Sequence, residues 1–359
     1  MTPTAVLVIP AVTALATMAL VPLAKYLARR TGAIDHPGQR KIHDTPIARL
    51  GGIAPALVFW TAAGLGFAAL KDPFFQKFLG EGLQEAPTVG PKLLGILVGS
   101  LIAFATGFID DIFGSRFPFW AKALGQVSAA LCVVLGGVST MFLPHPVLNG
   151  ILTVLWLAGI TNAFNLLDNM DGLASGVALI ASSMLLANAL TSGENLIAAL
   201  TLAFMGVLMG FLWFNFNPAS IFLGDCGSHF IGFVMASILL LDRYVTSASS
   251  SYFPILMPVL LLAVPIVDTT TVVIIRLREG RPIYVGDARH LSHTLVARGF
   301  SKKGAVLLIY LMTLCLGLSA LPLRDATLTE TFIVLLQSLC FIAVIILLMF
   351  SGNPPEEKA

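Results

Sequence analysis

GSLIAFATGFIDD, residues 99–111, is a run of uncharged residues that ends in two adjacent aspartates. Together with the apolar residues before it, the run has about the 20-residue length that a helix needs to cross a bilayer. Charged side chains are costly inside a bilayer, so we expect Asp110 and Asp111 where the helix meets water. The segment therefore predicts a transmembrane helix with a polar site at its end.

The composition of the whole chain extends this interpretation. Of the 359 residues, 57% are hydrophobic and 11% are charged, whereas soluble domains average about 25% charged residues. A soluble protein of this size could not cover its surface with so few charges, which excludes a nucleic-acid-binding protein, a secreted disulfide scaffold and a soluble multidomain enzyme. The four cysteines form no CxxC pair, so neither a zinc site nor a redox dithiol is indicated.

Similar apolar segments recur along the chain, and we count about eleven. They lie near 4–28, 51–70, 92–109, 117–137, 147–167, 172–192, 195–214, 228–241, 253–275, 303–321 and 329–350. Porin-like strands would alternate polar and apolar residues in segments of about ten residues, and these segments do not. The sequence thus predicts an all-α polytopic membrane protein, a single transmembrane domain over 1–359.

The basic residues predict the direction of these helices, because Lys and Arg concentrate in cytoplasmic loops. With the N-terminus outside, most of the 21 Lys and Arg residues fall inside, largely within 25–49 and 276–303. The five outside are Lys71, Lys77, Lys92, Arg243 and Arg324. The expected orientation therefore has the N-terminus outside and the C-terminus in the cytoplasm.

The acidic residues near the apolar segments follow the same direction, although they played no part in setting it. They are Asp110, Asp111, Asp168, Asp171, Asp225 and Asp268. The first five fall at inside helix ends, and Asp268 lies about two turns within its helix. We therefore expect an active site on the cytoplasmic face, built from loops near 29–50, 110–117, 168–172, 215–228 and 276–303.

Asp110 and Asp111 repel each other, so near a low-dielectric boundary one of them would bind a proton unless a cation sits beside it. Oxygen-rich, acidic sites suit Mg²⁺. A simple helix stop is the alternative interpretation of this pair.

The segment TNAFNLLDNMDGLASG, residues 161–176, carries a polar stripe. Helical geometry places Asn162, Asn165 and Asn169 on one face, and it allows Asp168 and Asp171, three residues apart, to meet. At a membrane helix end such a stripe must face protein, water or ligand, so packing between helices is the alternative to a substrate site.

Two further segments suggest phosphate chemistry. In IFLGDCGSHFIGF, residues 221–233, glycines near Asp225 permit a close backbone approach, and the helix that follows could offer its N-terminus to an anion or a metal-bound phosphate. The basic segment 276–303 contains His290 and His293 beside Asp287. Phosphate binding fits its charge, and anchoring to anionic lipid is the alternative.

With these residues laid out, the chain resembles the polyprenyl-phosphate N-acetylhexosamine-1-phosphate transferases, a glycosyltransferase 4 type family of membrane enzymes. The resemblance covers about residues 30 to 300 and rests on five pieces in the same order. They are DHPGQRKIHDTPIARLGG (35–52), the Asp110-Asp111 pair, NAFNLLDNMDGLA (162–174), FLGDCGS (222–228) and DARHLSH (287–293). The first and last pieces resemble the branch that uses UDP-N-acetylglucosamine and undecaprenyl phosphate.

The resemblance implies roles for individual residues. Catalysis would involve Asp110, Asp111, Asp168 and Asp171. Mg²⁺, with Mn²⁺ as an alternative, would bind Asp225, Asp171 and Asp111. The substrates would contact Lys41, Arg49, Asn162, Asn165, Asn169, His290 and His293. The family also implies a bacterial inner-membrane location among membrane lipids, and it leaves a homodimer open.

The implied reaction is attack by a phosphate oxygen of undecaprenyl phosphate on the sugar-bearing phosphorus of UDP-GlcNAc, with UMP as the leaving group. The second pKa of a phosphate monoester is about 6, so the acceptor is largely dianionic at neutral pH and needs little help from a base. We therefore expect electrostatic and orienting roles for the aspartates, with Asp110 as a general base the second choice. The alternatives are the phospho-N-acetylmuramoyl-pentapeptide transferase of the same family, a cation-coupled transporter and, least, a GxGD-type intramembrane protease.

Overall fold

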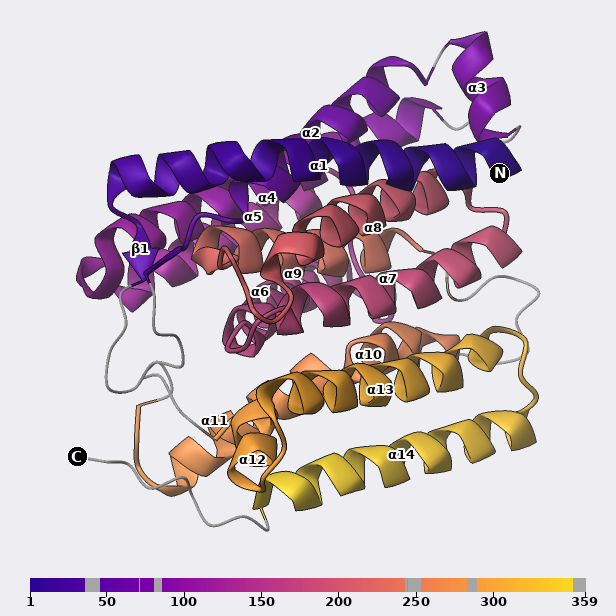
Figure 1. Ribbon diagram of the computed structural model, residues 1–359. Coiled ribbons are helices and arrows are strands. Elements are labelled where there is room, and N and C mark those ends of the chain that lie inside the picture. Colours follow the sequence, from indigo (N-terminus) through magenta and orange to yellow (C-terminus); the bar gives the residue numbers. More distant parts are fainter. Residues whose placement is uncertain are drawn as a thin grey trace. The chain divides into compact units, whose positions relative to one another are not determined.

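The computed structural model describes residues 1–35, 46–70, 72–80, 86–242, 244, 253–282 and 289–350. It consists of two compact units, Met1–Asp242 and Arg243–Ala359, which are coloured from indigo to salmon and from orange to yellow in Figure 1. Each unit is described by itself, and the single-domain organisation stays a prediction.

Unit 1 contains nine α-helices, a short 3-10 turn and a two-stranded hairpin within its described residues. They are α1 (Pro3–Thr31), β1 (Ile34–Asp35), β2 (Ile47–Ala48), α2 (Ile53–Ala68), α3 (Pro73–Leu79), α4 (Ala86–Phe113), η1 (Gly114–Arg116), α5 (Phe119–Leu135), α6 (Pro146–Leu167), α7 (Leu173–Thr191), α8 (Asn195–Asn215) and α9 (Gly224–Leu241). The hairpin is a small departure from the all-α prediction, with Ile34 opposite Ala48 and Asp35 opposite Ile47.

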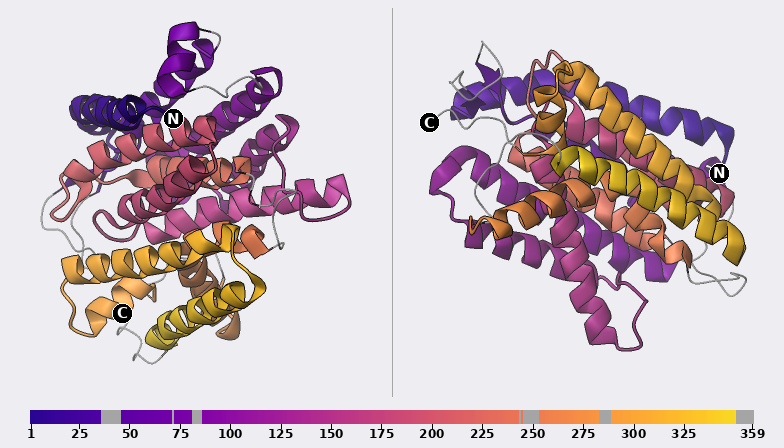
Figure 2. Two further views of the ribbon diagram at one scale, coloured as in Figure 1. Left: turned by 90° about the vertical axis from the view of Figure 1, so that its right-hand side faces the viewer. Right: turned by 90° about the horizontal axis from the view of Figure 1, so that it is seen from below.

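Unit 2 is built on helices that pack around α13. They are η2 (Phe253–Leu256), α10 (Met257–Leu261), α11 (Ala263–Arg278), α12 (Leu291–Ala297), α13 (Lys302–Ala320), η3 (Leu321–Arg324) and α14 (Leu328–Phe350). Helices α10, α11, α12 and α14 all contact α13, and both views of Figure 2 show α13 and α14 side by side.

Every predicted apolar segment is helical, and the membrane-spanning character of the chain is confirmed. Among the described residues, eight helices are long and apolar enough to cross a bilayer, and two bent helix pairs raise this number to at most ten. Helix α5 is shorter, and segment 253–275 is broken into α10 and α11 with a bend of 74°. The predicted count of eleven spans and the orientation stay predictions.

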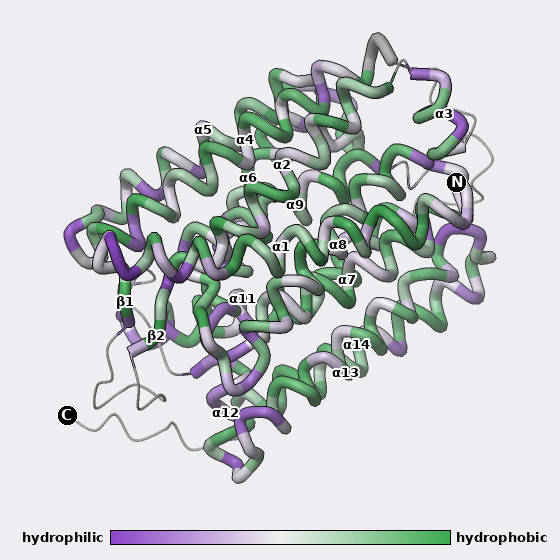
Figure 3. Tube along the Cα trace, turned by 45° about the horizontal axis from the view of Figure 1, so that its top comes forward, coloured by the Kyte–Doolittle hydropathy of each residue, from purple (hydrophilic) through white to green (hydrophobic). Residues whose placement is uncertain are grey.

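Helix α9 forms the centre of unit 1, because its neighbours cover most of its surface. It packs against α2, α4, α6, α7 and α8, and 83% of its apolar stretch is buried. Hydrophobic residues run along the helices in Figure 3, whereas hydrophilic residues gather at their ends, near β1 and near α3. The polar end near β1 is where α9 begins, beside the end of α4.

Candidate active site

One ammonium group lies at the centre of the polar end of unit 1. Lys122 Nζ donates hydrogen bonds to Asp110 Oδ2 at 2.7 Å, Asp225 Oδ2 at 2.8 Å and Asn165 Oδ1 at 3.2 Å. These residues come from α5, α4, α9 and α6, so four helices meet at this point. The side chains of Lys122, Asp110 and Asp225 are 21%, 16% and 24% exposed, which leaves room for a ligand to reach them.

The neighbouring carboxylate of Asp111 has a different task. Its Oδ1 accepts a hydrogen bond from the amide of Asp225, and its Oδ2 accepts one from the amide of Cys226, both at 2.9 Å. These amides open helix α9, so the completely buried Asp111 side chain caps α9 from the end of α4. The helix start that we expected to bind an anion therefore binds the anion of Asp111, which orients Asp225.

Glycine permits this close arrangement. Gly224 has φ +75, and a Cβ at this position would lie 1.9 Å from the carbonyl oxygen of Arg49 and 2.7 Å from Asp111 Oδ2. The backbone of β2 and the following residues runs alongside, with Phe222 N donating to Ala48 O at 2.8 Å and Gly52 N donating to Leu223 O at 2.9 Å. This pairing brings Arg49 to the cluster.

The guanidinium of Arg49 lies between two carboxylates, 3.8 Å from Asp111 Oδ1 and 3.8 Å from Asp35 Oδ1. Burial works to lower the pKa of Arg49, but the surrounding carboxylates, Asp111 and Asp225 foremost, outweigh it and raise the pKa. The Arg49 side chain is 41% exposed, so it remains available to a soluble ligand.

A second layer of hydrogen bonds fixes the asparagines of α6. Asn165 Nδ2 donates to Ser228 Oγ at 2.9 Å. Asn162 and Gln126 exchange two hydrogen bonds, at 2.7 and 3.1 Å, and Gln126 Nε2 lies 3.5 Å from the ring of His229. Asn165 thus reaches the cluster, whereas Asn162 orients the helices behind it.

Helix α6 ends at Leu167, so the helical spacing does not continue to Asp171, but the charge of Asp171 still helps to raise the pKa of Asp168. Asp171 Oδ2 accepts hydrogen bonds from Asn217 Nδ2 and Ala219 N, both at 3.0 Å. Asn169 Nδ2 donates to the carbonyl oxygen of Leu166 at 2.8 Å. Asp171 therefore ties the α6–α7 turn to the α8–α9 connection.

Among the loop residues around the cluster, Asp168 has the most strongly shifted pKa. Burial first, and then the carboxylate of Asp225, raise its pKa from 3.8 to about 8, and Arg49 offsets only part of this effect. Asp168 therefore carries a proton at neutral pH. Among the described residues, the carboxylates of Asp110, Asp111 and Asp225 then face two cationic side chains, those of Lys122 and Arg49, so this cluster has more negative than positive groups.

In unit 2, the predicted residue His290 is held by a carboxylate that had no assigned role. Its Nδ1 lies 2.7 Å from Asp268 Oδ2, and Asp268 Oδ1 accepts a hydrogen bond from Leu291 N at 2.7 Å. Both side chains are almost fully buried, with 4% and 1% exposed. His293 lies on α12, and Lys41 and Asp287 lie outside the described residues.

The structure thus brings together five residues that the sequence assigns to the site, namely Asp110, Asp111, Asp225, Asn165 and Arg49. It adds Lys122, which the sequence does not assign to the site. The sequence indicates Lys122 only as a basic residue of the inside face. Its signal was a charged side chain one turn before Gln126 on an otherwise apolar helix, a pattern that is costly unless both residues face polar partners.

The cluster has part of the donor set of a divalent-cation site. Within the described ranges, no three His, Cys, Asp or Glu side chains converge on one point, so Asp225, Asp171 and Asp111 do not form a ready-made cage. Three oxygen atoms nevertheless already surround the cation of Lys122. Mg²⁺ binds through one or two carboxylates together with substrate phosphates, and this donor set fits that mode.

Comparisons with known proteins agree with this chemistry. The model of glycosyl transferase family 4 matches residues 93–242, which include most of α4 and all of α5 to α9. A probable undecaprenyl-phosphate N-acetylglucosaminyl 1-phosphate transferase of Bacillus subtilis is 34% identical over 343 residues, covering 93% of this chain and 89% of the relative. A decaprenyl-phosphate N-acetylglucosaminephosphotransferase of Mycobacterium tuberculosis is 31% identical, covering 80% and 74%. A phospho-N-acetylmuramoyl-pentapeptide-transferase of Limosilactobacillus fermentum is 34% identical over 166 residues, covering 41% and 50%.

Proposed function

Because the chain belongs to glycosyl transferase family 4, we propose that it transfers N-acetylglucosamine 1-phosphate from UDP-GlcNAc to undecaprenyl phosphate and releases UMP. The observation that carries this proposal is the Lys122 ammonium between Asp110 and Asp225, at the meeting point of four helices. Two of the relatives that align over most of this chain are named for the transfer of this phospho-sugar to a polyprenyl phosphate.

The reaction joins two negatively charged partners, so charge neutralisation is the main task of the site. A phosphate oxygen of the acceptor bonds to the sugar-bearing phosphorus of the donor, and the bond from that phosphorus to the bridging oxygen breaks as UMP leaves. Lys122 and Arg49 supply positive charge at the cluster, and His290, His293 and Lys41 are proposed to contact phosphate or sugar. Because the acceptor is already largely dianionic, Asp110 orients and balances charge rather than removing a proton.

A divalent cation completes this account. Asp110 and Asp225 would hold Mg²⁺, with Mn²⁺ as a substitute, and the ion would neutralise the diphosphate of the donor. The same two carboxylates now bind Lys122, so Lys122 and a divalent cation compete for them. Asp111 keeps Asp225 oriented in either state through its bonds to the α9 backbone.

The orientation is part of the proposal. The bias of basic residues toward the end that carries Asp110 and Asp225 supports a cytoplasmic active site in a bacterial inner membrane, where a soluble nucleotide sugar meets a lipid phosphate. The muramoyl-pentapeptide nucleotide is the second candidate donor, because a transferase that is named for it matches 41% of the chain.

Release of UMP tests the proposal directly. Purified full-length protein would receive undecaprenyl phosphate and Mg²⁺ with either UDP-GlcNAc or UDP-N-acetylmuramoyl-pentapeptide, and reactions without the lipid would serve as controls. We expect lipid-dependent UMP from UDP-GlcNAc. UMP from the pentapeptide donor alone would overturn the assigned sugar, and no UMP from either donor would overturn the transferase and favour the transporter alternative.

A further inference from the structure

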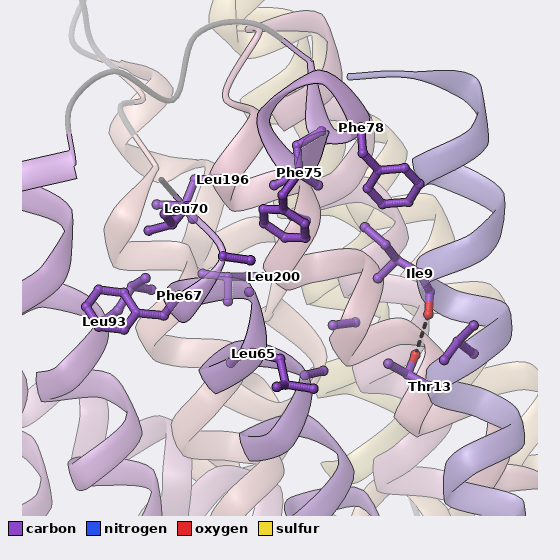
Figure 4. Close-up of a pocket in the computed structure, with 18 of the residues that line it drawn as sticks. Ile9, Thr13, Leu65, Phe67, Leu70, Phe75, Phe78, Leu93, Leu196 and Leu200 are labelled. Atoms are coloured by element: carbon purple, nitrogen blue, oxygen red, sulfur yellow. Dashed lines mark hydrogen bonds between the residues drawn. The ribbon is translucent and has the colours of Figure 1, made fainter. Parts of the chain in front are cut away.

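A large apolar cavity lies at the end of unit 1 that is away from the Asp110/Asp225 cluster. Its volume is about 410 Å³, and its walls come from α1, α2, α3, α4 and α8. The stretches that line it are the first half of α1, the last two turns of α2 and the first turns of α8. Its lining residue on α4 is Leu93, near the start of that helix, whereas Asp110 of the carboxylate cluster lies near the end of α4. Figure 4 shows Phe75, Phe78 and Leu200 among the side chains around it.

Among the described residues, the lining is hydrocarbon apart from one hydroxyl. That hydroxyl belongs to Thr13, whose Oγ1 already donates to the carbonyl oxygen of Ile9 at 2.9 Å, the bond drawn in Figure 4. Water needs several polar partners in a cavity, and apolar cavities stay dry and accept apolar ligands. The chemistry of the walls therefore selects a hydrocarbon occupant.

Small residues make the space, and the rim opens toward lipid. Ala62 and Gly66 on α2 and Ala199 on α8 line the cavity with little or no side chain. At the rim, Leu65 is 67% exposed and Val12 is 58% exposed, so the lining continues into the surface that a bilayer covers. A chain from the surrounding lipid can reach the cavity without crossing a polar barrier, and it would gain dispersion contacts that an empty space lacks.

Basic residues stand next to the lining residues at the membrane-surface end. Lys92 directly precedes the lining residue Leu93 on α4, and the exposed Lys77 lies between the lining residues Phe75 and Phe78 on the short helix α3. Basic residues at a membrane surface attract anionic lipid headgroups. The cavity and its edge thus match the two parts of one molecule, a hydrocarbon chain and a phosphate.

We propose that this cavity binds one acyl chain of an anionic glycerophospholipid, in the half of the bilayer away from the Asp110/Asp225 cluster. This site is distinct from the site that binds the phosphate of the acceptor lipid. That phosphate must reach the Asp110/Asp225 cluster, and Asp110 lies at the other end of α4. The proposal does not depend on the identity of the sugar donor. Its ligand would be a structural lipid that joins α1, α2 and α8.

The test uses photoreactive lipid in nanodiscs with the full-length protein. Phosphatidylglycerol with a diazirine on one acyl chain would be cross-linked, and the labelled residues would be mapped by mass spectrometry. We expect labels concentrated on cavity-lining residues of α1, α2 and α8 and a loss of those labels in Ala62→Phe, which fills the cavity. Ala68→Phe is the matched control, because Ala68 is on the same helix but is exposed and does not line the cavity.

A second variant and a second lipid keep the outcome decisive. Ala199→Phe fills the cavity from α8 and replaces Ala62→Phe if that variant does not fold. In a parallel experiment, a photoreactive undecaprenyl phosphate that is labelled at the far end of its chain replaces the photoreactive phosphatidylglycerol. Labelling of the cavity by this lipid and not by phosphatidylglycerol, or equal labelling of wild type, Ala62→Phe and Ala199→Phe, would overturn the proposal.

Discussion

Asp225 in unit 1 and Asp268 in unit 2 each bind a basic side chain at 2.7 to 2.8 Å, but the two carboxylates differ in what else can reach them. Asp225 is 24% exposed and shares Lys122 with Asp110 and Asn165. Asp268 is 1% exposed, and its second oxygen is occupied by the amide of Leu291. A ligand can therefore reach Asp225 and replace its lysine, whereas Asp268 is buried and each of its oxygens already accepts a hydrogen bond.

This difference in exposure divides the carboxylates into two groups. Asp225 can contact a substrate, whereas Asp268 can only orient another side chain. A carboxylate accepts hydrogen bonds and donates none, so His290 must carry a proton on Nδ1 and present Nε2 away from Asp268. Asp268 therefore sets the orientation and tautomer of His290, just as Asp111 sets the orientation of Asp225. The predictions below test this division from the largest expected effect to the smallest.

The largest loss of activity is expected for Asp110→Asn. This substitution removes one charge from the cluster of Asp110, Asp225 and Asn165 around Lys122 but keeps the size of the side chain. We expect UMP release to fall on the order of 10²- to 10³-fold, the cost of removing one electrostatic contact to a transition state. The loss should persist at alkaline pH if Asp110 binds or orients. Full recovery at high pH would instead make Asp110 the general base. Asp72→Asn, at the start of α3, is the control and should retain activity.

Lys122→Met tests whether the lysine and a divalent cation compete. We expect turnover to fall about 10²-fold, because a charge that faces the phosphates is lost. Binding of Mn²⁺ without substrate, measured by electron paramagnetic resonance, should become tighter because Asp110 and Asp225 are released. Lys77→Met on α3 is the control for loss of a lysine. Unchanged Mn²⁺ affinity would show that the two carboxylates are not the shared site.

Much of this cluster could be predicted because its residues sit in local patterns. The apolar run before Asp110 and Asp111 predicts a polar site at a helix end without knowledge of the fold. The glycines around Asp225 likewise predict a close backbone approach. Lys122 could not be assigned in this way, since its role depends on how α5 packs beside α4 and α6. The contacts of Asp171 could not be predicted from helical spacing either, because α6 ends at Leu167 and Asp171 accepts hydrogen bonds from Asn217 and Ala219.

The same limit applied to Asp268, whose partner lies 22 residues further along the chain. Asp268→Asn should keep the bond from the Leu291 amide but lose the acceptor for His290 Nδ1–H. We expect turnover to fall on the order of 10-fold, as is usual when the partner that orients a functional histidine is removed, with a shifted pH profile. The double variant Asp268→Asn/His290→Ala should be no worse than His290→Ala alone. Losses that add fully would show that Asp268 acts independently of His290.

The smallest effect is expected on the thermal stability and concerns Asp168. This residue lies beside the cluster around Lys122 and has a pKa of about 8. Between about pH 4 and pH 8 the folded protein binds more protons at this site than the unfolded chain does, so the stabilisation is complete at low pH and is lost as the pH rises through 8. In Mg²⁺-free protein, the thermal midpoint should therefore fall by a few degrees at most between pH 6 and pH 9. Asp168→Asn, which stays neutral, should show a smaller fall. An equal fall in both proteins would mean that another group titrates in this range and that the pKa of Asp168 is not raised to about 8.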